Sequence, residues 1–278
     1  MRRLNFGYNT NGFAHHSLED ALSILSKLGY DCVALTLDHH TLQPGHSTTR
    51  RQLPVIRSLL QQFRCRPAIE TGARFLLDPL RKHQPTLISP SKLDRQKRLH
   101  FLKQSIDIAA RLNAEVVSLW SGTPVDQAGN AVWMRRLRTG CFWLADYAAK
   151  RNVRLAFEPE PGMFIDTMDK FSDLFERVAH PHFGLTIDIG HLHCQGEPIE
   201  STLRAWKDRL WNVHIEDMRR SVHDHLFFGD GEIAFPPVLR TLREIGYVGG
   251  AHVELSRHSH NAVETARRAL AFLRTASS

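Results

Sequence analysis

The chain has 278 residues, of which 42% are hydrophobic and 23% are charged, a composition that is ordinary for a soluble globular protein. No run of about 18 apolar residues occurs, so we expect no transmembrane helix and no membrane partner. The net charge is +7, but the basic residues come as scattered pairs. Such pairs are typical of a solvated layer of outer helices, and they favour a small anionic substrate over a nucleic-acid partner.

The N-terminal residues turn polar too soon to form the apolar region of a signal peptide. The four cysteines lie far apart and form no CxxC pair, which excludes a zinc knuckle and a redox motif of that type. We therefore expect reduced thiols in a cytoplasmic protein. No helix carries an isolated apolar stripe, so the sequence does not define an oligomeric state. The cysteines are Cys32, Cys65, Cys141 and Cys194.

Short apolar or β-branched runs alternate with longer segments of helical period, the pattern of a parallel sheet wrapped by helices. The predicted strands are Leu4–Tyr8, Cys32–Leu37, Arg66–Glu70, Glu115–Trp120, Arg154–Glu160, Phe183–Asp188, Leu210–Glu216 and Ala251–Leu255. The predicted helices are Leu18–Leu28, Thr49–Phe63, Lys92–Leu112, Ala131–Arg151, Met168–Val178, Ile199–Lys207, Pro236–Ile245 and Asn261–Arg274.

The junctions between these elements support the same alternation. Ser17 precedes Asp20 by three residues, which is the spacing of a capping box. Four predicted helices end in Gly or Asn just before the next strand, where a left-handed C-cap belongs. No Gly-rich phosphate fingerprint follows any strand, which disfavours an open doubly wound sheet. We therefore predict an α/β fold, a single (β/α)8 TIM-barrel domain over residues 1–278, with its site at the C-terminal ends of the strands.

Four late strands begin apolar and end in an acid or a histidine. Strand alternation points these polar side chains toward the barrel axis, because their apolar neighbours must face the helices. Several converging carboxylates repel one another when buried, and a divalent cation removes that cost. The alternative is a set of ordinary strand-end groups that water and hydrogen bonds satisfy. The predicted metal ligands are Glu158, Asp188, His214 and Glu254, for Mn²⁺, Zn²⁺, Mg²⁺ or Co²⁺.

In these positions the chain resembles the xylose-isomerase-like TIM-barrel superfamily, which includes sugar isomerases, ketose 3-epimerases, inosose-type dehydratases and endonuclease IV. That family places its metal ligands on strands five to eight, with the Asp of strand six in a D-x-x-H motif. Asp188 and His191 match this motif, and Gly229-Asp230-Gly231 resembles the family's G-x-G after strand seven. Glu160 also faces inward, but Glu158 directly follows the apolar run, as the family ligand does.

The resemblance implies an isomerase or epimerase that acts on a small keto-sugar, polyol or sugar phosphate through a metal-stabilised enediolate. Dehydration of a similar substrate stays open. Glu158 and Glu254 would accept and return the proton. His191 and Arg219 would hold substrate oxygens, although His191 also suits a packed position behind the ligands. Glu160 would face the substrate.

A second polar cluster follows the third predicted strand, at Glu70 and Arg74. Glu70 ends an apolar strand as the metal carboxylates do, and Arg74 has the chemistry to bind an anionic substrate group. The alternative interpretation is a Glu70–Arg74 ion pair that ties down the long loop predicted from roughly Gly72 to Ser91. A second long loop is predicted from Asp217 to Phe235.

Two other functions remain open from the sequence. His223 and His225 resemble the additional ligand pair of endonuclease IV, which would make the protein a phosphodiesterase for abasic DNA. That enzyme needs histidines at the ends of strands three and four, where this chain has Glu70 and Trp120. The other function is a metal-binding or metabolite-binding accessory protein without turnover, which only an activity screen separates from an enzyme.

Overall fold

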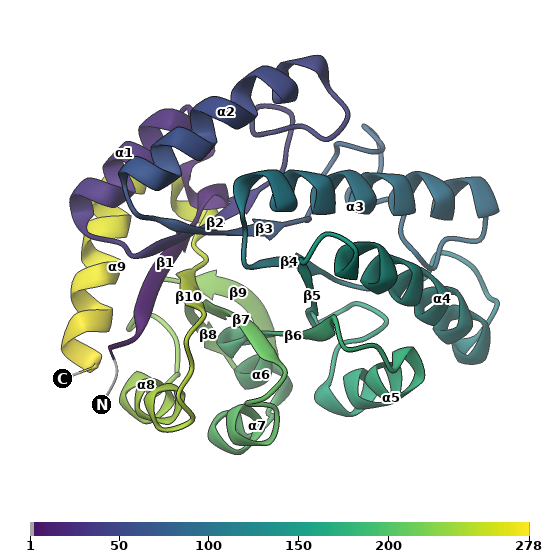
Figure 1. Ribbon diagram of the computed structural model, residues 1–278. Coiled ribbons are helices and arrows are strands. Elements are labelled where there is room, and N and C mark those ends of the chain that lie inside the picture. The colour runs from purple at the N-terminus through teal and green to yellow at the C-terminus, as the bar shows by residue number, and fades with distance from the viewer. Residues whose placement is uncertain (1–2, 278) are drawn as a thin grey trace.

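The computed structural model describes residues 3–277, and in this part of the chain eight parallel strands close into a barrel with helices around it (Figure 1). Around the barrel the strands follow the order β1-β10-β7-β6-β5-β4-β3-β2, so each strand lies beside its neighbours in the chain. The predicted TIM barrel is confirmed. Its strands are β1 (Asn5–Asn9), β2 (Cys32–Thr36), β3 (Arg66–Glu70), β4 (Val116–Leu119), β5 (Arg154–Phe157), β6 (Phe183–Asp188), β7 (Leu210–Ile215) and β10 (Gly250–Val253).

The helices lie outside the barrel, and three of them have the bounds that the sequence predicts: α1 (Leu18–Leu28), α3 (Lys92–Leu112) and α5 (Met168–Val178). Four others differ from the prediction by one to two residues at their ends: α2 (Ser47–Gln62), α4 (Asn130–Ala149), α8 (Phe235–Glu244) and α9 (Ala262–Ala276). The short helix α7 (Ile199–Ala205) ends two residues early. The 3-10 turns η1 (Thr10–Phe13) and η2 (Ser256–Asn261) follow the strands β1 and β10.

Two elements near the barrel mouth were not predicted. The helix α6 (Ile189–Gln195) follows β6 at once and is too short for a hydrophobic period to show. The hairpin formed by β8 (Asp217–Arg219) and β9 (Val222–Leu226) lies in the segment that the sequence indicated as a loop. Its second strand is half-exposed and rich in histidine and aspartate, so it lacks the apolar alternation that marks a strand.

The predicted caps of α1 and α3 are confirmed. The Ser17 hydroxyl accepts a hydrogen bond from the backbone N–H of Asp20 at 3.1 Å, as an N-cap does. Gly29 and Asn113 end α1 and α3 in the left-handed conformation, with φ of 93° and 55°. Glycine and asparagine adopt this conformation at low cost, so the chain can leave each helix and turn directly into the next strand.

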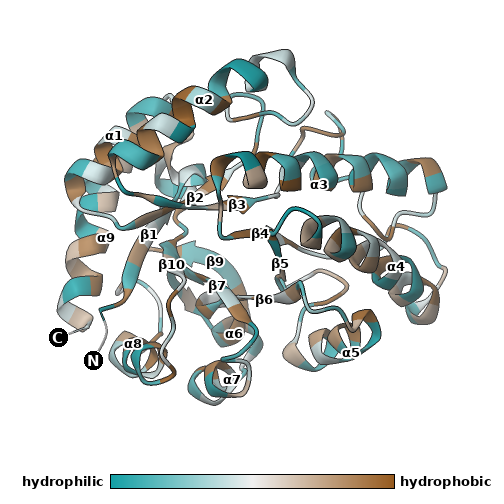
Figure 2. Ribbon diagram, viewed as in Figure 1, coloured by the Kyte–Doolittle hydropathy of each residue, from teal (hydrophilic) through white to brown (hydrophobic). Residues whose placement is uncertain are grey.

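The hydrophobic core lies mainly between the barrel and the helices, where the outward side chains of the strands meet the apolar face of each helix. Hydrophobic and hydrophilic residues alternate along the helices in Figure 2, as one buried face requires. A smaller cluster fills the barrel interior with the small side chains of Ala34, Ala68, Val116 and Ala156, packed against Trp211. Apolar packing of this kind leaves the polar side chains to the mouth of the barrel.

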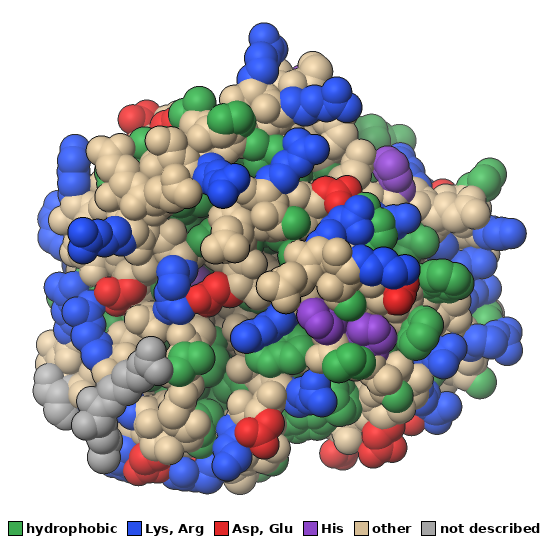
Figure 3. All heavy atoms as spheres, viewed as in Figure 1, with side chains coloured by type: hydrophobic (Ala, Val, Ile, Leu, Met, Phe, Trp, Pro, Cys, Tyr) green, Lys and Arg blue, Asp and Glu red, His purple; other side chains and the backbone are tan. Residues whose placement is uncertain are grey.

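The surface carries charges of both signs. Figure 3 shows Lys and Arg side chains in separate groups over one face, with Asp and Glu between them. No helix among residues 3–277 is long and apolar enough to cross a bilayer. The four cysteines are buried and unpaired, as the sequence predicts.

Truncation of Phe171 on α5 tests the packing between barrel and helices. Its ring is fully buried against Phe157, Phe183 and Trp206, with centroids 5.9, 6.2 and 5.0 Å away. We expect Phe171→Ala to lower the free energy of unfolding by about 3–5 kcal/mol in urea denaturation, because it removes a buried ring and leaves a cavity. The control is Leu80→Ala, at a side chain that is 89% exposed. A loss no larger than in this control would contradict the packing.

Candidate metal centre

A cavity of about 290 Å³ opens at the C-terminal ends of the strands. Its lining comes from most of the barrel strands and from the segments that follow them, so residues far apart in the chain meet there. The side chains of the lining are almost all polar or charged. They include Asn9, Asn11, Thr36, Glu70, Arg74, Lys82, His83, Ser118, Trp120, Glu158, Glu160, His191, His214, His223, His225, Glu254 and Arg257.

The four predicted metal ligands meet in this cavity. Each offers a ligand atom, and the four atoms all lie within 4.8 Å of one another. Asp188 is the last residue of β6 and His214 lies in β7, while Glu158 and Glu254 directly follow β5 and β10. Glu160 lines the cavity but is outside this group of ligand atoms. The register of the parallel strands, which pairs Asp188 with His214, therefore brings the ligands to one level of the barrel.

His214 stands at the centre of the group. Its Nδ1 atom lies 2.9 Å from Glu158 Oε1 and 3.0 Å from Glu254 Oε2, and its Nε2 atom lies 2.9 Å from Glu70 Oε1. Burial lowers the pKa of His214, but the charges of Glu70, Glu158 and Glu254 outweigh it and hold the pKa well above its usual range. Positive charge is thus strongly favoured at the point where the carboxylates converge.

The carboxylate of Asp188 is fixed in place by the start of α6. Its Oδ1 atom accepts a hydrogen bond from the backbone N–H of His191 at 3.0 Å, as an N-cap. Its Oδ2 atom is buried and has no hydrogen-bond partner among the described residues. A buried carboxylate oxygen without a donor is costly, and a cation would satisfy it. Three carboxylates and one imidazole suit Mg²⁺, Mn²⁺, Co²⁺ or Zn²⁺, so these residues fit a divalent metal ion.

Further hydrogen bonds hold the ligands from behind. Asn11 donates from Nδ2 to Glu254 Oε1 at 2.8 Å. Asn212 is fully buried and donates to Glu70 Oε1 at 3.0 Å. With Glu70 accepting from Nε2 of His214, the Nδ1 atom faces the other carboxylates, which is the arrangement that fixes the tautomer of a metal-bound histidine. The alternative of a Glu70–Arg74 ion pair is therefore wrong, because the Glu70 carboxylate points into the barrel.

His191, His223 and His225 form a second group of potential ligands next to the first. The Nδ1 atom of His191 donates to the carbonyl of Pro159 at 3.2 Å, so its Nε2 atom faces the cavity as an acceptor, 3.0 Å from His223 Nε2. Burial lowers the pKa of His191 to about 4, which keeps the ring neutral near pH 7. The sequence predicted a substrate contact for His191 and additional metal ligands at His223 and His225. The structure brings these three histidines together.

Glu216 belongs to the site and was not singled out as a ligand or a substrate contact from the sequence. It is fully buried, and neither carboxylate oxygen has a hydrogen-bond partner among residues 3–277. Burial raises its pKa well above the usual range, and the charge of Asp188 raises it further. A side chain at position 190 would collide with Glu216 Oε1, which explains why the Asp188–His191 motif has a glycine there. The feature of the sequence that could have identified Glu216 is the alternation of polar residues along one predicted strand, at Asn212, His214 and Glu216.

The contacts of the Asp217 side chain account for the two glycines of the Gly229–Gly231 motif. Its carboxylate accepts hydrogen bonds from the backbone N–H groups of Gly229, Gly231 and Ile233 at 2.8, 3.1 and 3.0 Å. A Cβ at Gly231 would overlap Asp217 Oδ1. The motif therefore wraps around a buried aspartate and fixes the segment that follows the hairpin. Sequence reasoning placed Asp217 in a loop and missed this role.

Arg74 and Glu160 line the cavity, and their contact with a substrate stays a prediction. Arg219 does not. It lies at the end of β8 with its side chain exposed, and its Nη2 atom donates to the carbonyl of Asp230 at 3.0 Å. The hairpin turns Arg219 away from the barrel axis, which the prediction of an irregular loop did not foresee.

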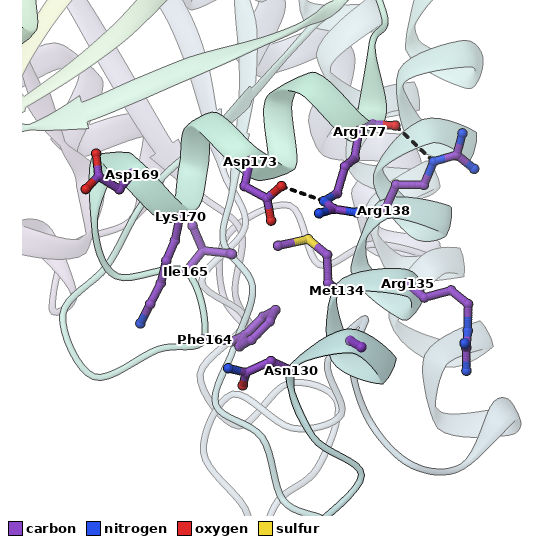
Figure 4. Close-up of a pocket in the computed structure, with 11 residues that line it drawn as sticks. Asn130, Met134, Arg135, Arg138, Phe164, Ile165, Asp169, Lys170, Asp173 and Arg177 are labelled. Atoms are coloured by element: carbon purple, nitrogen blue, oxygen red, sulfur yellow. Dashed lines mark hydrogen bonds and ion pairs between the residues drawn. The ribbon is translucent and has the colours of Figure 1, made fainter.

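A larger cavity, of about 740 Å³, lies between α4 and α5 outside the barrel (Figure 4). Figure 4 shows Met134, Phe164 and Ile165 around it, with charged side chains along its edge. Arg177 pairs with Asp173 at 2.6 Å and Lys170 with Asp166 at 2.6 Å, so these charges are largely satisfied by helix neighbours. This cavity holds none of the potential ligand groups found in the described residues, whereas the smaller cavity in the barrel mouth holds the candidate metal ligands.

Fold and site together define a TIM barrel with a candidate metal centre at the C-terminal ends of its strands. The sequence pattern of the xylose isomerase-like TIM barrel family matches residues 9–276, and the chain belongs to this family. One relative is the L-ribulose-5-phosphate 3-epimerase UlaE of Shigella flexneri serotype 5b (strain 8401), which is 26% identical over 238 residues, 85% of this chain and 81% of that protein.

Solved structures share the fold over nearly the whole chain. The D-allulose 3-epimerase from Methylomonas sp., in complex with D-allulose, superposes with a TM-score of 0.79 at 19% identity, over 99% of this chain and 98% of the other. The IOLI protein, which was crystallised with a zinc atom, superposes with a TM-score of 0.76 at 19% identity, over 97% of this chain and 98% of the other.

The choice between Glu158 and Glu160 as ligand gives a direct test of the centre. We expect chelator-treated protein to bind Mn²⁺ or Zn²⁺ in isothermal titration calorimetry, and metal at about 100 times its Kd to stabilise the fold by about 2.7 kcal/mol. Glu158→Gln removes a ligand and should weaken binding strongly. Glu160→Gln is the matched control and should keep the affinity. The reverse result would assign the ligand to Glu160.

Glu70→Gln tests the hydrogen bond behind His214. We expect metal affinity to fall by about 10- to 100-fold, because the glutamine amide orients the imidazole less firmly and carries no charge. The control is Glu115→Gln, whose carboxylate binds Arg66 at the N-terminal end of the barrel strands. Equal affinities of the two variants would show that Glu70 has no part in metal binding.

Proposed function

We propose that the protein is a divalent-metal-dependent epimerase or isomerase of a small keto-sugar or sugar phosphate. One observation carries the proposal: Glu158 and Glu254 approach the same His214 nitrogen, at 2.9 and 3.0 Å, from strands that are separated in the barrel by β6 and β7. Carboxylates on two sides of one point are suited to remove a proton from one face of a carbon atom and return it on the other.

The names of two relatives support this reaction class. The Shigella flexneri relative and the Methylomonas structure are both named as 3-epimerases of ketoses, one with a phosphate and one without. The carbon that such a reaction inverts lies next to the carbonyl group, so its proton is the acidic one. A bound divalent cation would supply positive charge that stabilises the negative charge on the substrate oxygens when this proton leaves.

The chain's own side chains divide the remaining work. Glu158 and Glu254 accept the proton on one side and donate it on the other. The neutral His191, with its Nε2 atom turned to the cavity, accepts a hydrogen bond from a substrate hydroxyl. Glu160, on the cavity wall, binds another hydroxyl. Trp120, which is almost fully buried, closes one wall and limits access of water.

The endonuclease alternative has less support. Glu70 and Trp120 occupy the ends of the strands where a binuclear centre would need histidines, and each is engaged elsewhere: Glu70 binds His214 and Trp120 packs on Arg98. His191, His223 and His225 remain candidates for an additional metal ion. Elemental analysis of the metal content per chain tests that possibility, and cleavage of an abasic duplex would restore the alternative.

Hydrogen exchange at the substrate carbon tests the epimerase and separates it from an accessory protein. In D₂O, the metal-loaded protein should incorporate deuterium next to the carbonyl group of a converted ketose, as followed by NMR. Glu254→Gln should slow this incorporation by at least about 100-fold, because one of the two proton carriers is lost.

Glu264→Gln on α9 serves as the control, since Glu264 does not line the cavity, has a side chain that is 43% exposed, and pairs only with Arg267 among the described residues. Metal content measured by elemental analysis distinguishes loss of the cation from loss of proton transfer. Full incorporation by Glu254→Gln with bound metal would contradict the role of Glu254. No incorporation by the unmodified protein with any ketose would favour the accessory role.

A further inference from the structure

We infer that the segment between β3 and α3 forms an anion-binding subsite, and that the substrate of this barrel is a phosphorylated ketose whose phosphate binds Arg74 and Lys82. The inference rests on the proposed function for the identity of the sugar, while the subsite itself rests on charges and contacts in the described residues.

Arg74 and Lys82 both line the cavity, and neither side chain makes an ion pair or a hydrogen bond within the described residues. Two other cations nearby differ in this respect. Arg81 binds Asp78 at 2.7 Å and does not line the cavity. Arg257 lines the cavity but pairs with Asp224 at 2.6 Å. The cavity thus contains two cationic groups on one short segment that form no ion pair within the described residues.

A third cation stands directly behind this segment. Arg98 of α3 is 1% exposed and donates from Nη2 to the carbonyl of Thr71 at 2.9 Å, but its Nη1 atom has no hydrogen-bond partner among residues 3–277. The guanidinium packs 4.4 Å from the centre of the Trp120 ring rather than against an acid. A buried cation without a counter-ion is costly, and its field adds to that of Arg74 and Lys82.

His83 ties these parts together. Its ring packs edge-on against Trp120 with centroids 5.0 Å apart, and its Nδ1 atom lies 2.9 Å from the carbonyl of Gly72. Burial lowers the pKa of His83, and the positive charges of Lys82, Arg98 and Arg74 lower it further, so all three cations lie near this ring. The segment therefore has a fixed shape against the cavity wall.

The cavity is consequently polarised. The four predicted metal ligands come from β5, β6, β7 and the end of β10, and the cations without an ion pair come from the opposite part of the barrel, after β3. Glu70 at the end of β3 also carries an acid, but its carboxylate is engaged by His214 and Asn212. A ligand that spans the cavity needs oxygens for the metal centre at one end and negative charge at the other. Guanidinium and ammonium groups bind phosphate oxygens through charge-assisted hydrogen bonds, and a sugar phosphate has both ends in one small molecule.

Kinetics with matched substrates test this inference on the metal-loaded protein. Initial rates are measured with a free ketose, with the same ketose bearing a terminal phosphate, and with its terminal carboxylate analogue. We expect kcat/KM to be highest for the phosphate by at least about tenfold, the effect of one charge-assisted hydrogen bond. Arg74→Gln and Lys82→Gln should each lose at least about tenfold more with the phosphorylated than with the free ketose. Arg81→Gln, one residue from Lys82, is the control and should lose nothing.

Binding of inorganic phosphate, followed by ³¹P NMR, gives a readout that does not depend on turnover. Phosphate should bind the unmodified protein and Arg81→Gln, and should bind Arg74→Gln and Lys82→Gln at least about tenfold more weakly. Equal kcat/KM for free and phosphorylated ketoses, a preference for the carboxylate, or phosphate binding that is insensitive to both substitutions would overturn the inference. Absence of turnover with every ketose, together with phosphate binding through Arg74 and Lys82, would instead refute the proposed function and leave the anion subsite in place.

Discussion

Three carboxylates, Glu158, Asp188 and Glu254, converge on one imidazole at the mouth of the barrel, and the rest of the site is arranged around this concentration of negative charge. Burial and mutual repulsion oppose it, so positive charge is needed at their meeting point. The raised pKa of His214 and the unpartnered Oδ2 atom of Asp188 both express that need. A divalent cation meets it with the ligand chemistry that these side chains offer. The hydrogen bonds from Asn11 and Asn212 then hold the surrounding carboxylates in place.

The barrel interior contains two different environments, an apolar lower part and a polar mouth that holds the charged groups. Alanine and valine side chains around Trp211 fill the lower interior and exclude water there. The mouth remains polar, and its charges are unequally distributed, with the four predicted metal ligands on the side of β5 to β10 and the cations without an ion pair after β3. An asymmetric cavity of this kind selects ligands by charge distribution as well as by shape. In the proposed function, reaction chemistry and substrate recognition would therefore occupy different parts of one barrel mouth, as they do wherever loops after different strands supply different groups.

Local patterns carried much of the information about the fold. The strands β3 and β6 and the helices α1, α3 and α5 have the predicted bounds because their apolar runs end at caps or polar residues that the chain places directly after them. The hairpin β8–β9 and the helix α6 were missed because they are short and polar, and their conformation depends on contacts such as those of Asp217 with distant backbone groups. The family resemblance implied that Arg219 lies at the site. Its side chain points elsewhere because the hairpin sets its direction, and the position of Arg219 in the chain does not show this.

The sequence by itself indicated the alternation of strands and helices and the four candidate ligand positions, Glu158 among them, because both follow from periodicity and from polar residues at strand ends. Only the tertiary structure decided how the groups pair: Glu70 with His214 rather than with Arg74, and Glu216 buried beside Asp188. These pairings join residues from different strands, and their distances depend on the register and closure of the barrel. A linear pattern contains no information on such distances, whereas burial and packing fix them.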